Sequence, residues 1–279
     1  MSQPWDKGSH PDMPRLGSFD LLRIILRAAA LIVLVFGGLL VLLLARLIER
    51  PLCGKNRPAT PYITQFVCRN ALRILGMGFH LTGKPMEARG AVVANHSSWL
   101  DIFALNSAKR IYFVSKSEVA RWPGIGWLAR ATGTVFIERN PARARQQTLM
   151  FQERLLAGHK LLFFPEGTST DGQQVLAFKT TLFQAFMADG LRDQISVQPV
   201  AVIYRAPAGT DVRFYGWWGS MEFGTHLLAT LAPARSGAVE VIYCAPLRVA
   251  DFSNRKELAA ACETAVRTAH TQRLAAPAA

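Results

Sequence analysis

Residues 91–101 read AVVANHSSWLD. The first four side chains are small or β-branched, which is typical of a short buried strand. Two polar side chains, His96 and Asp101, follow the point where that strand ends. In an open α/β sheet, residues just after the carboxyl end of a strand lie at the crevice where ligands bind. This stretch therefore predicts an α/β fold with His96 at its ligand-binding edge.

Five further short apolar segments continue the strand pattern, at residues 111–114, 134–137, 161–164, 197–203 and 239–243. Stretches with helical periodicity lie between and around these strands, at residues 62–76, 98–107, 124–131, 141–157, 178–188, 222–232 and 254–273. This alternation predicts a mostly parallel central sheet flanked by helices. We expect one catalytic domain over residues 51–274, followed by a frayed tail at 275–279.

The unbroken apolar run from residue 28 to 45 predicts a membrane-anchor helix over about residues 21–50. At 1.5 Å per residue its 18 residues reach about 27 Å, close to the hydrocarbon thickness of a bilayer. Arginines flank both ends, so orientation stays open, as does the choice between spanning and monotopic insertion. Residues 1–20, rich in Pro and Gly, are predicted to be disordered. Trp217 and Trp218 form a second candidate membrane contact, with core packing as the alternative.

The net charge of +13 suits an anionic membrane, a nucleic acid or an acidic partner, and does not choose among them. The four cysteines contain no C-x-x-C pair, and no histidine lies at metal-ligand spacing from them. We therefore predict neither a zinc site nor a disulfide framework. Gly124, Gly126 and Ala129 loosely match a dinucleotide fingerprint, but no strand precedes them, so a tight turn packing a helix is the better interpretation.

His96 and Asp101 have the spacing of a base and its orienting carboxylate. An Asp that accepts a hydrogen bond from one imidazole nitrogen leaves the other free to take a substrate proton. A His–Asp helix cap is the structural alternative. Two other predicted strands also end in polar motifs: residues 133–139 (GTVFIER) end on Arg139, and residues 164–169 read FPEGTS. An arginine can bind phosphate with two hydrogen bonds.

Together, the blocks His96-x-x-x-x-Asp101, Phe136-Ile-x-Arg139, Phe164-Pro-Glu-Gly-Thr168 and Val197-x-Pro-Val200 resemble the lysophosphatidic acid acyltransferase family. The resemblance covers roughly residues 75–205. It implies that His96 is the general base and Asp101 its partner. It also implies that the acceptor head group is bound by Arg139, Glu166, Gly167 and Thr168, with Lys179 where the family often carries a basic residue. Ser169 stands where relatives keep an arginine, and Thr181 where they often keep a glycine.

By this resemblance the chain is a membrane-associated O-acyltransferase that uses acyl-CoA or acyl-acyl carrier protein as co-substrate and needs no cofactor or metal. The family's acceptor, 1-acyl-sn-glycerol-3-phosphate, giving phosphatidic acid, is the first expectation. Lyso-ornithine lipid is the alternative, because Ser169 removes a cation from the phosphate site. The implied partners are the lysolipid, the acyl donor and an anionic inner membrane, with the catalytic domain facing the cytoplasm and no nucleic acid bound. A non-enzymatic basic membrane or nucleic-acid-binding protein and a thioester hydrolase are the rival classes.

Overall fold

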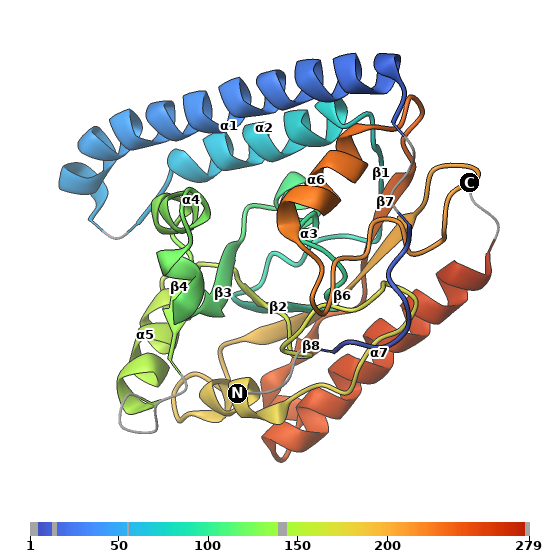
Figure 1. Ribbon diagram of the computed structural model, residues 1–279. Helices are drawn as coiled ribbons and strands as arrows, with labels where there is room; N and C mark the ends of the chain where they lie inside the picture. The colour runs from blue at the N-terminus through green and yellow to red at the C-terminus, as the bar shows by residue number, and fades with distance from the viewer. Residues whose placement is uncertain (1–4, 13–15, 55, 139–143, 277–279) are drawn as a thin grey trace.

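The computed structural model describes residues 5–12, 16–54, 56–138 and 144–276 (Figure 1). The eight strands of its sheet are β1 (Gly78–Thr82), β2 (Gly90–Ala94), β3 (Tyr112–Lys116), β4 (Val135–Ile137), β5 (Leu161–Phe163), β6 (Ser196–Arg205), β7 (Ala238–Tyr243) and β8 (Leu247–Arg248). The helices are α1 (Ser18–Cys53), α2 (Thr60–Ile74), α3 (Asp101–Ala108), α4 (Ile125–Thr132), α5 (Ala144–Leu156), α6 (Phe223–Leu231) and α7 (Arg255–Ala275). Short 3₁₀ helices are η1 (Ser117–Arg121), η3 (Thr180–Met187) and η4 (Val249–Asp251).

The sheet runs β1-β7-β6-β2-β5-β3-β4, with β8 paired to β6. All pairings from β6 to β4 along this order are parallel, as is β1 with β7, while β6 pairs antiparallel with β7 and β8. The mostly parallel sheet is therefore confirmed, and all six predicted strands are present. The sequence missed β1 and β8, because β1 is a partly exposed edge strand without an apolar run and β8 has two residues.

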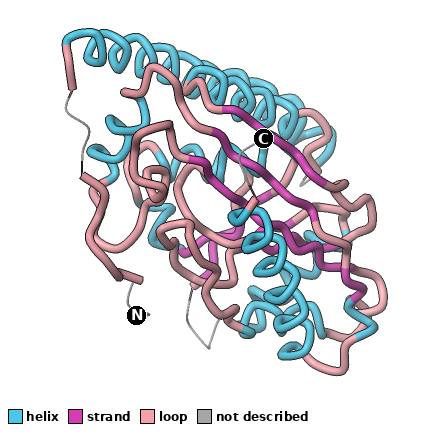
Figure 2. Tube along the Cα trace, turned by 90° about the vertical axis from the view of Figure 1, so that its right-hand side faces the viewer, coloured by secondary structure: helices cyan, strands magenta, loops and turns pink. Residues whose placement is uncertain are grey.

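Helices cover both faces of the sheet, and the strands lie between them in Figure 2. Successive side chains of a strand point to opposite faces. Val92 and Ala94 of β2 accordingly pack in a core with α2, α3 and α6, whereas Ala91 and Val93 pack with α5, η3 and α7. The helix predicted at residues 178–188 is the 3₁₀ helix η3. Because β2 is central and buried on both faces, it provides a rigid anchor for the loop that follows it.

The long helix α1 lies along α2 on the outside of the domain (Figure 1). Its N-terminal half is held by arginines: Arg27 donates to the carbonyl oxygens of Leu231 and Pro233 at 2.9 and 2.8 Å. Its most apolar 18-residue window has a mean hydropathy of 2.9 and is only 6% buried, so it is not a core helix. Exposed apolar surface on this scale requires lipid or a partner. The length and apolarity of α1 support membrane association. The helix spans Ser18–Cys53 and is longer than the predicted residues 21–50.

Of the residues before α1 that are predicted to be disordered, the structure describes 5–12, 16 and 17. Residues 5–12 form no helix or strand, but the rings of Trp5 and His10 lie 6.0 and 5.3 Å from that of Trp218. Trp218 is only 2% exposed, so of the two alternatives for this residue, membrane contact and core packing, the structure supports core packing. At the other end, α7 continues to Ala275, and residues 277–279 lie outside the described part of the chain.

Candidate active site

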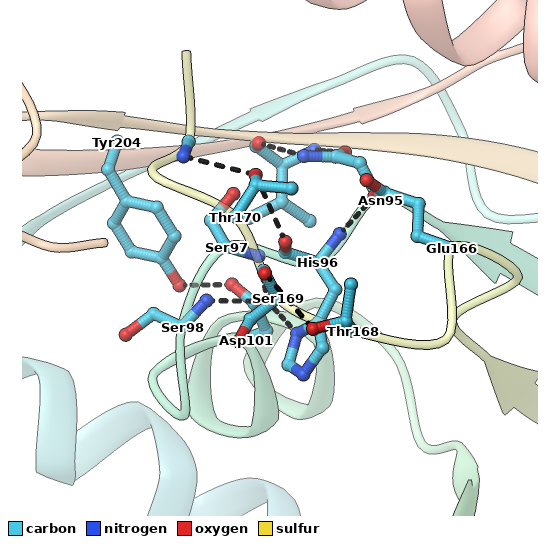
Figure 3. Close-up of polar contacts among 12 residues, drawn as sticks. Asn95, His96, Ser97, Ser98, Asp101, Glu166, Thr168, Ser169, Thr170 and Tyr204 are labelled. Atoms are coloured by element: carbon cyan, nitrogen blue, oxygen red, sulfur yellow. Dashed lines mark hydrogen bonds and ion pairs between the residues drawn. The ribbon is translucent and has the colours of Figure 1, made fainter. Parts of the chain in front are cut away.

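His96 and Asp101 meet at the carboxyl end of β2, as the spacing predicts. β2 ends at Ala94, and Asp101 is the first residue of α3. Nδ1 of His96 lies 2.7 Å from Oδ2 of Asp101 (Figure 3). A carboxylate only accepts hydrogen bonds, so Nδ1 carries the proton and Nε2 has a free lone pair. The side chain of His96 is 23% exposed and that of Asp101 is fully buried.

Asp101 accepts three further hydrogen bonds. The backbone N–H groups of Ser97 and Ser98 donate to Oδ2 at 2.9 and 3.2 Å. The hydroxyl of Tyr204, near the end of β6, donates to Oδ1 at 2.7 Å. Burial, reinforced by the charge of Asp101, raises the pKa of Tyr204 well above 10, so its hydroxyl stays protonated. These contacts fix the carboxylate and, through it, the imidazole.

Tyr204 and Asn95 are site residues that the sequence analysis did not single out. Asn95 donates to the carbonyl of Val202 at 2.9 Å and accepts from its N–H at 2.8 Å, so it ties the loop after β2 to β6. The alternation of side chains along β6 could have identified Tyr204. Val200 and Val202 pack in the same core as Ala94, and Tyr204, two residues further on, points to the same face.

The carboxyl of Glu166, for which the sequence predicted head-group binding, is turned into the interior of the domain. Its carboxyl is only 1% exposed. One oxygen accepts the N–H of His96 at 2.7 Å and the other accepts the N–H of Leu176 at 2.8 Å. Burial raises its pKa to about 8, while these two hydrogen bonds act in the opposite direction. Glu166 therefore positions the backbone of His96.

The imidazole of His96 also stacks on Phe164, with ring centroids 4.0 Å apart and 12° between the planes. The N–H of Thr170 donates to the carbonyl of His96 at 2.9 Å. The segment from Phe164 to Thr170 therefore contacts His96 twice. Phe164 packs against its ring, and Thr170 binds its backbone carbonyl. Both contacts restrict the imidazole to one orientation.

Gly167 lies against Lys179, and Figure 3 shows Thr168 beside the imidazole of His96. Gly167 has a φ of +73°, and a Cβ added there would lie 2.7 Å from Nζ of Lys179, so the ammonium sits over the glycine. The hydroxyl of Thr168 accepts the N–H of Trp5 at 3.3 Å. Ser169, next in the chain, is half-buried. Arg139 lies outside the described residues, although β4, which precedes it, ends at this same edge of the sheet.

Comparison with known proteins agrees with this geometry. A protein-family model described as Acyltransferase matches residues 80–203. The lyso-ornithine lipid O-acyltransferase of Rhodobacter capsulatus is 58% identical over 90% of this chain and 91% of its own. The 1-acyl-sn-glycerol-3-phosphate acyltransferase of Neisseria gonorrhoeae is 37% identical over 44% of this chain and 50% of its own.

Among solved structures, the 1-acyl-sn-glycerophosphate acyltransferase of Thermotoga maritima superposes with a TM-score of 0.65. It is 21% identical, and the match covers 94% of this chain and 98% of that one, so it supports the fold from end to end. The segment that the family model matches includes His96, Asp101 and Glu166, and it ends at Ile203 within β6. The match to the Rhodobacter relative extends over nearly the whole chain and decides the assignment: the chain belongs to the lysolipid O-acyltransferase family.

Proposed function

We propose that this protein transfers a fatty acyl chain to lyso-ornithine lipid. The observation that carries the proposal is the 58% identity to the Rhodobacter lyso-ornithine lipid enzyme across nearly the whole chain. The Neisseria 1-acyl-sn-glycerol-3-phosphate enzyme matches over less than half of it. The first expectation from the sequence, lysophosphatidate as acceptor, therefore gives way to its alternative.

The acceptor loop fits this choice chemically. We define it as residues 167–169 together with Lys179. A phosphate carries up to two charges and is best held by several cations, especially arginine. Ser169 puts a neutral hydroxyl where the resembling family has arginine. An ornithine head group has a carboxylate and an amine instead, and the ammonium of Lys179 over Gly167 suits that carboxylate.

The reaction we propose needs no acyl-enzyme. Nε2 of His96 removes the proton from the lysolipid hydroxyl as that oxygen attacks the carbonyl carbon of an acyl thioester. The tetrahedral intermediate then expels the thiolate, which takes the proton back from His96, giving an ester and a free thiol. Asp101 holds the imidazole tautomer and stabilises the imidazolium. General base catalysis of this kind contributes about 10²–10⁴-fold.

Acyl-CoA or acyl-acyl carrier protein is the proposed donor, and both are acidic partners for a chain of net charge +13. The reaction as written uses no cofactor. Since both thioesters belong to the cytoplasm, we place the catalytic domain on the cytoplasmic side of the inner membrane, with α1 as the anchor.

The test uses the purified full-length protein with both lysolipids and both donors, and detects products by mass spectrometry. We expect acylated ornithine lipid to form with the higher kcat/KM, and His96→Ala to form it about 10²–10⁴-fold more slowly. Faster acylation of lysophosphatidate would overturn the acceptor assignment. Release of free fatty acid in place of the diacylated lipid would indicate a hydrolase.

A further inference from the structure

A turn that carries two exposed tryptophans lies at the same sheet edge as His96. The strands β2, β5 and β3 are parallel neighbours, so their carboxyl ends share one edge of the sheet. η1 follows β3 at that edge and leads through Trp122 into α4. α4 in turn contacts both α1 and α2, below one end of α1 in Figure 1. We call residues 121–130 the tryptophan turn.

The two tryptophans of the tryptophan turn are more exposed than the other tryptophans of the chain. The chain has six tryptophans, and Trp122 and Trp127 are the two that are exposed, at 44% and 61%. Arg121 and Arg130 are exposed beside them. From Lys116 to Thr132 the chain carries three basic residues (Lys116, Arg121, Arg130) and one acidic residue (Glu118), a net charge of +2.

This surface is built rigidly. Gly124 has a φ of +70°, and a Cβ on Gly126 would come within 2.3 Å of the carbonyl oxygen of Ala120, so α4 packs directly on η1. The N–H of Gly126 donates to the carbonyl of Trp122 at 2.8 Å, and the guanidinium of Arg130 donates to the carbonyl of Ala120. The glycine pattern noted in the sequence thus makes the expected tight turn. Its effect is to fix the backbone from which the side chains of Trp122 and Trp127 extend.

We propose that the tryptophan turn is a second membrane contact, which inserts Trp122 and Trp127 at the head-group level of an anionic bilayer. Tryptophan favours the membrane–water interface, because its ring is apolar and its N–H is polar. Arg121 and Arg130 pair with anionic lipid head groups. Continuity with the exposed apolar face of α1 identifies the partner as lipid.

Two contacts on one surface orient the domain where a single helix would leave it free to rotate. The first contact, α1, attaches the protein to the bilayer. The second, the tryptophan turn, holds the carboxyl edge of the sheet, where His96 lies, against the bilayer. A lysolipid hydroxyl then reaches His96 without leaving the membrane. The inference builds on the proposed acyl transfer but is the same for either acceptor.

The first experiment measures tryptophan fluorescence of the full-length protein on vesicles of phosphatidylglycerol and phosphatidylcholine brominated in its acyl chains. Bromine quenches indoles that enter the bilayer. We expect clear quenching in the wild type and loss of most of it in Trp122→Phe/Trp127→Phe, which still sediments with the vesicles through α1. The control Trp217→Phe, which changes a half-buried indole, keeps the quenching. Equal quenching in the double variant and the wild type would overturn the proposal, and this readout does not require activity.

The second experiment tests the consequence for turnover. Trp122→Ser/Trp127→Ser is expected to lower kcat/KM severalfold on lysolipid in vesicles, and to leave it unchanged on a short-chain lysolipid dissolved as monomers. The control is Val212→Ser, which removes an apolar side chain that is 65% exposed, elsewhere on the surface. An equal loss on both substrates would mean that the serines damage the fold and would count against an orienting role. Equal activity on vesicles would mean that the turn does not orient the enzyme.

Discussion

The histidine loop, residues 95–101, and the acceptor loop lie side by side at one sheet edge but are held in different ways. In the histidine loop, Asp101 is fully buried and accepts four hydrogen bonds, one of them from His96. In the acceptor loop, Thr168 and Ser169 are half-buried and Lys179 is exposed. The chemistry that all acyl transfers share is thus fixed by buried contacts. The part that would choose a head group is left on the surface, where substitutions alter specificity at little cost in stability.

The largest effect we predict is for the histidine loop. His96→Ala removes the base, and turnover should fall about 10²–10⁴-fold. The unfolding midpoint should change little, because the imidazole is partly exposed and Asp101 keeps its three other donors. Steady-state rates and thermal unfolding in detergent measure both. Turnover within tenfold of the wild type would remove His96 from the mechanism.

The same contrast explains what the sequence could predict. His96 and Asp101 are five residues apart, so their contact is local and follows from one strand end and one helix start. Tyr204 reaches Asp101 across 103 residues, through the pairing of β2 with β6, which requires the strand order. The sequence places Glu166 at the correct edge but cannot tell that its carboxyl turns inward to two backbone N–H groups.

A substitution in the acceptor loop should change selectivity and leave the chemistry intact. Ser169→Arg adds a cation where the resembling family has one. A charge-assisted hydrogen bond contributes about 1.5–3 kcal/mol, so the ratio of kcat/KM for lysophosphatidate to that for lyso-ornithine lipid should rise about tenfold to a hundredfold. Ser253→Arg, which adds the same charge near the start of α7, is the control. If the ratio does not move, position 169 does not face the head group.

A smaller loss is expected when the histidine loop is loosened without removing its base. Tyr204→Phe deletes the donor to Oδ1 of Asp101, and we expect kcat to fall about tenfold, the equivalent of one weak charged hydrogen bond, with KM for the acceptor unchanged. Asp101→Asn should lose more, and adding Tyr204→Phe to it should cost little more, because the tyrosine acts through the carboxylate. Losses that multiply independently would instead assign Tyr204 a purely structural role.

The last prediction leaves turnover at neutral pH unchanged and tests how the histidine loop is held. Trp99 of this loop donates its indole N–H to Nδ1 of His226 in α6 at 2.9 Å. Burial lowers the pKa of His226 from 6.5 to about 4, so the folded protein keeps this histidine neutral. In the unfolded chain it gains a proton below about pH 6.5.

Its contribution to stability is therefore fully present above pH 6.5 and is lost as the pH falls towards 4, by up to about 3 kcal/mol at 1.4 kcal/mol per pKa unit. His226→Gln keeps an acceptor for Trp99 but cannot titrate, so its unfolding midpoint should fall less between pH 7.5 and pH 5. Burial also lowers the pKa of His159 to about 4, so His159 likewise reduces stability at acid pH. It does so equally in both proteins and leaves the difference between them unchanged. If the unfolding midpoints of the two proteins fall equally with pH, protonation of His226 does not destabilise the fold. The histidine loop then does not depend on the neutral form of His226.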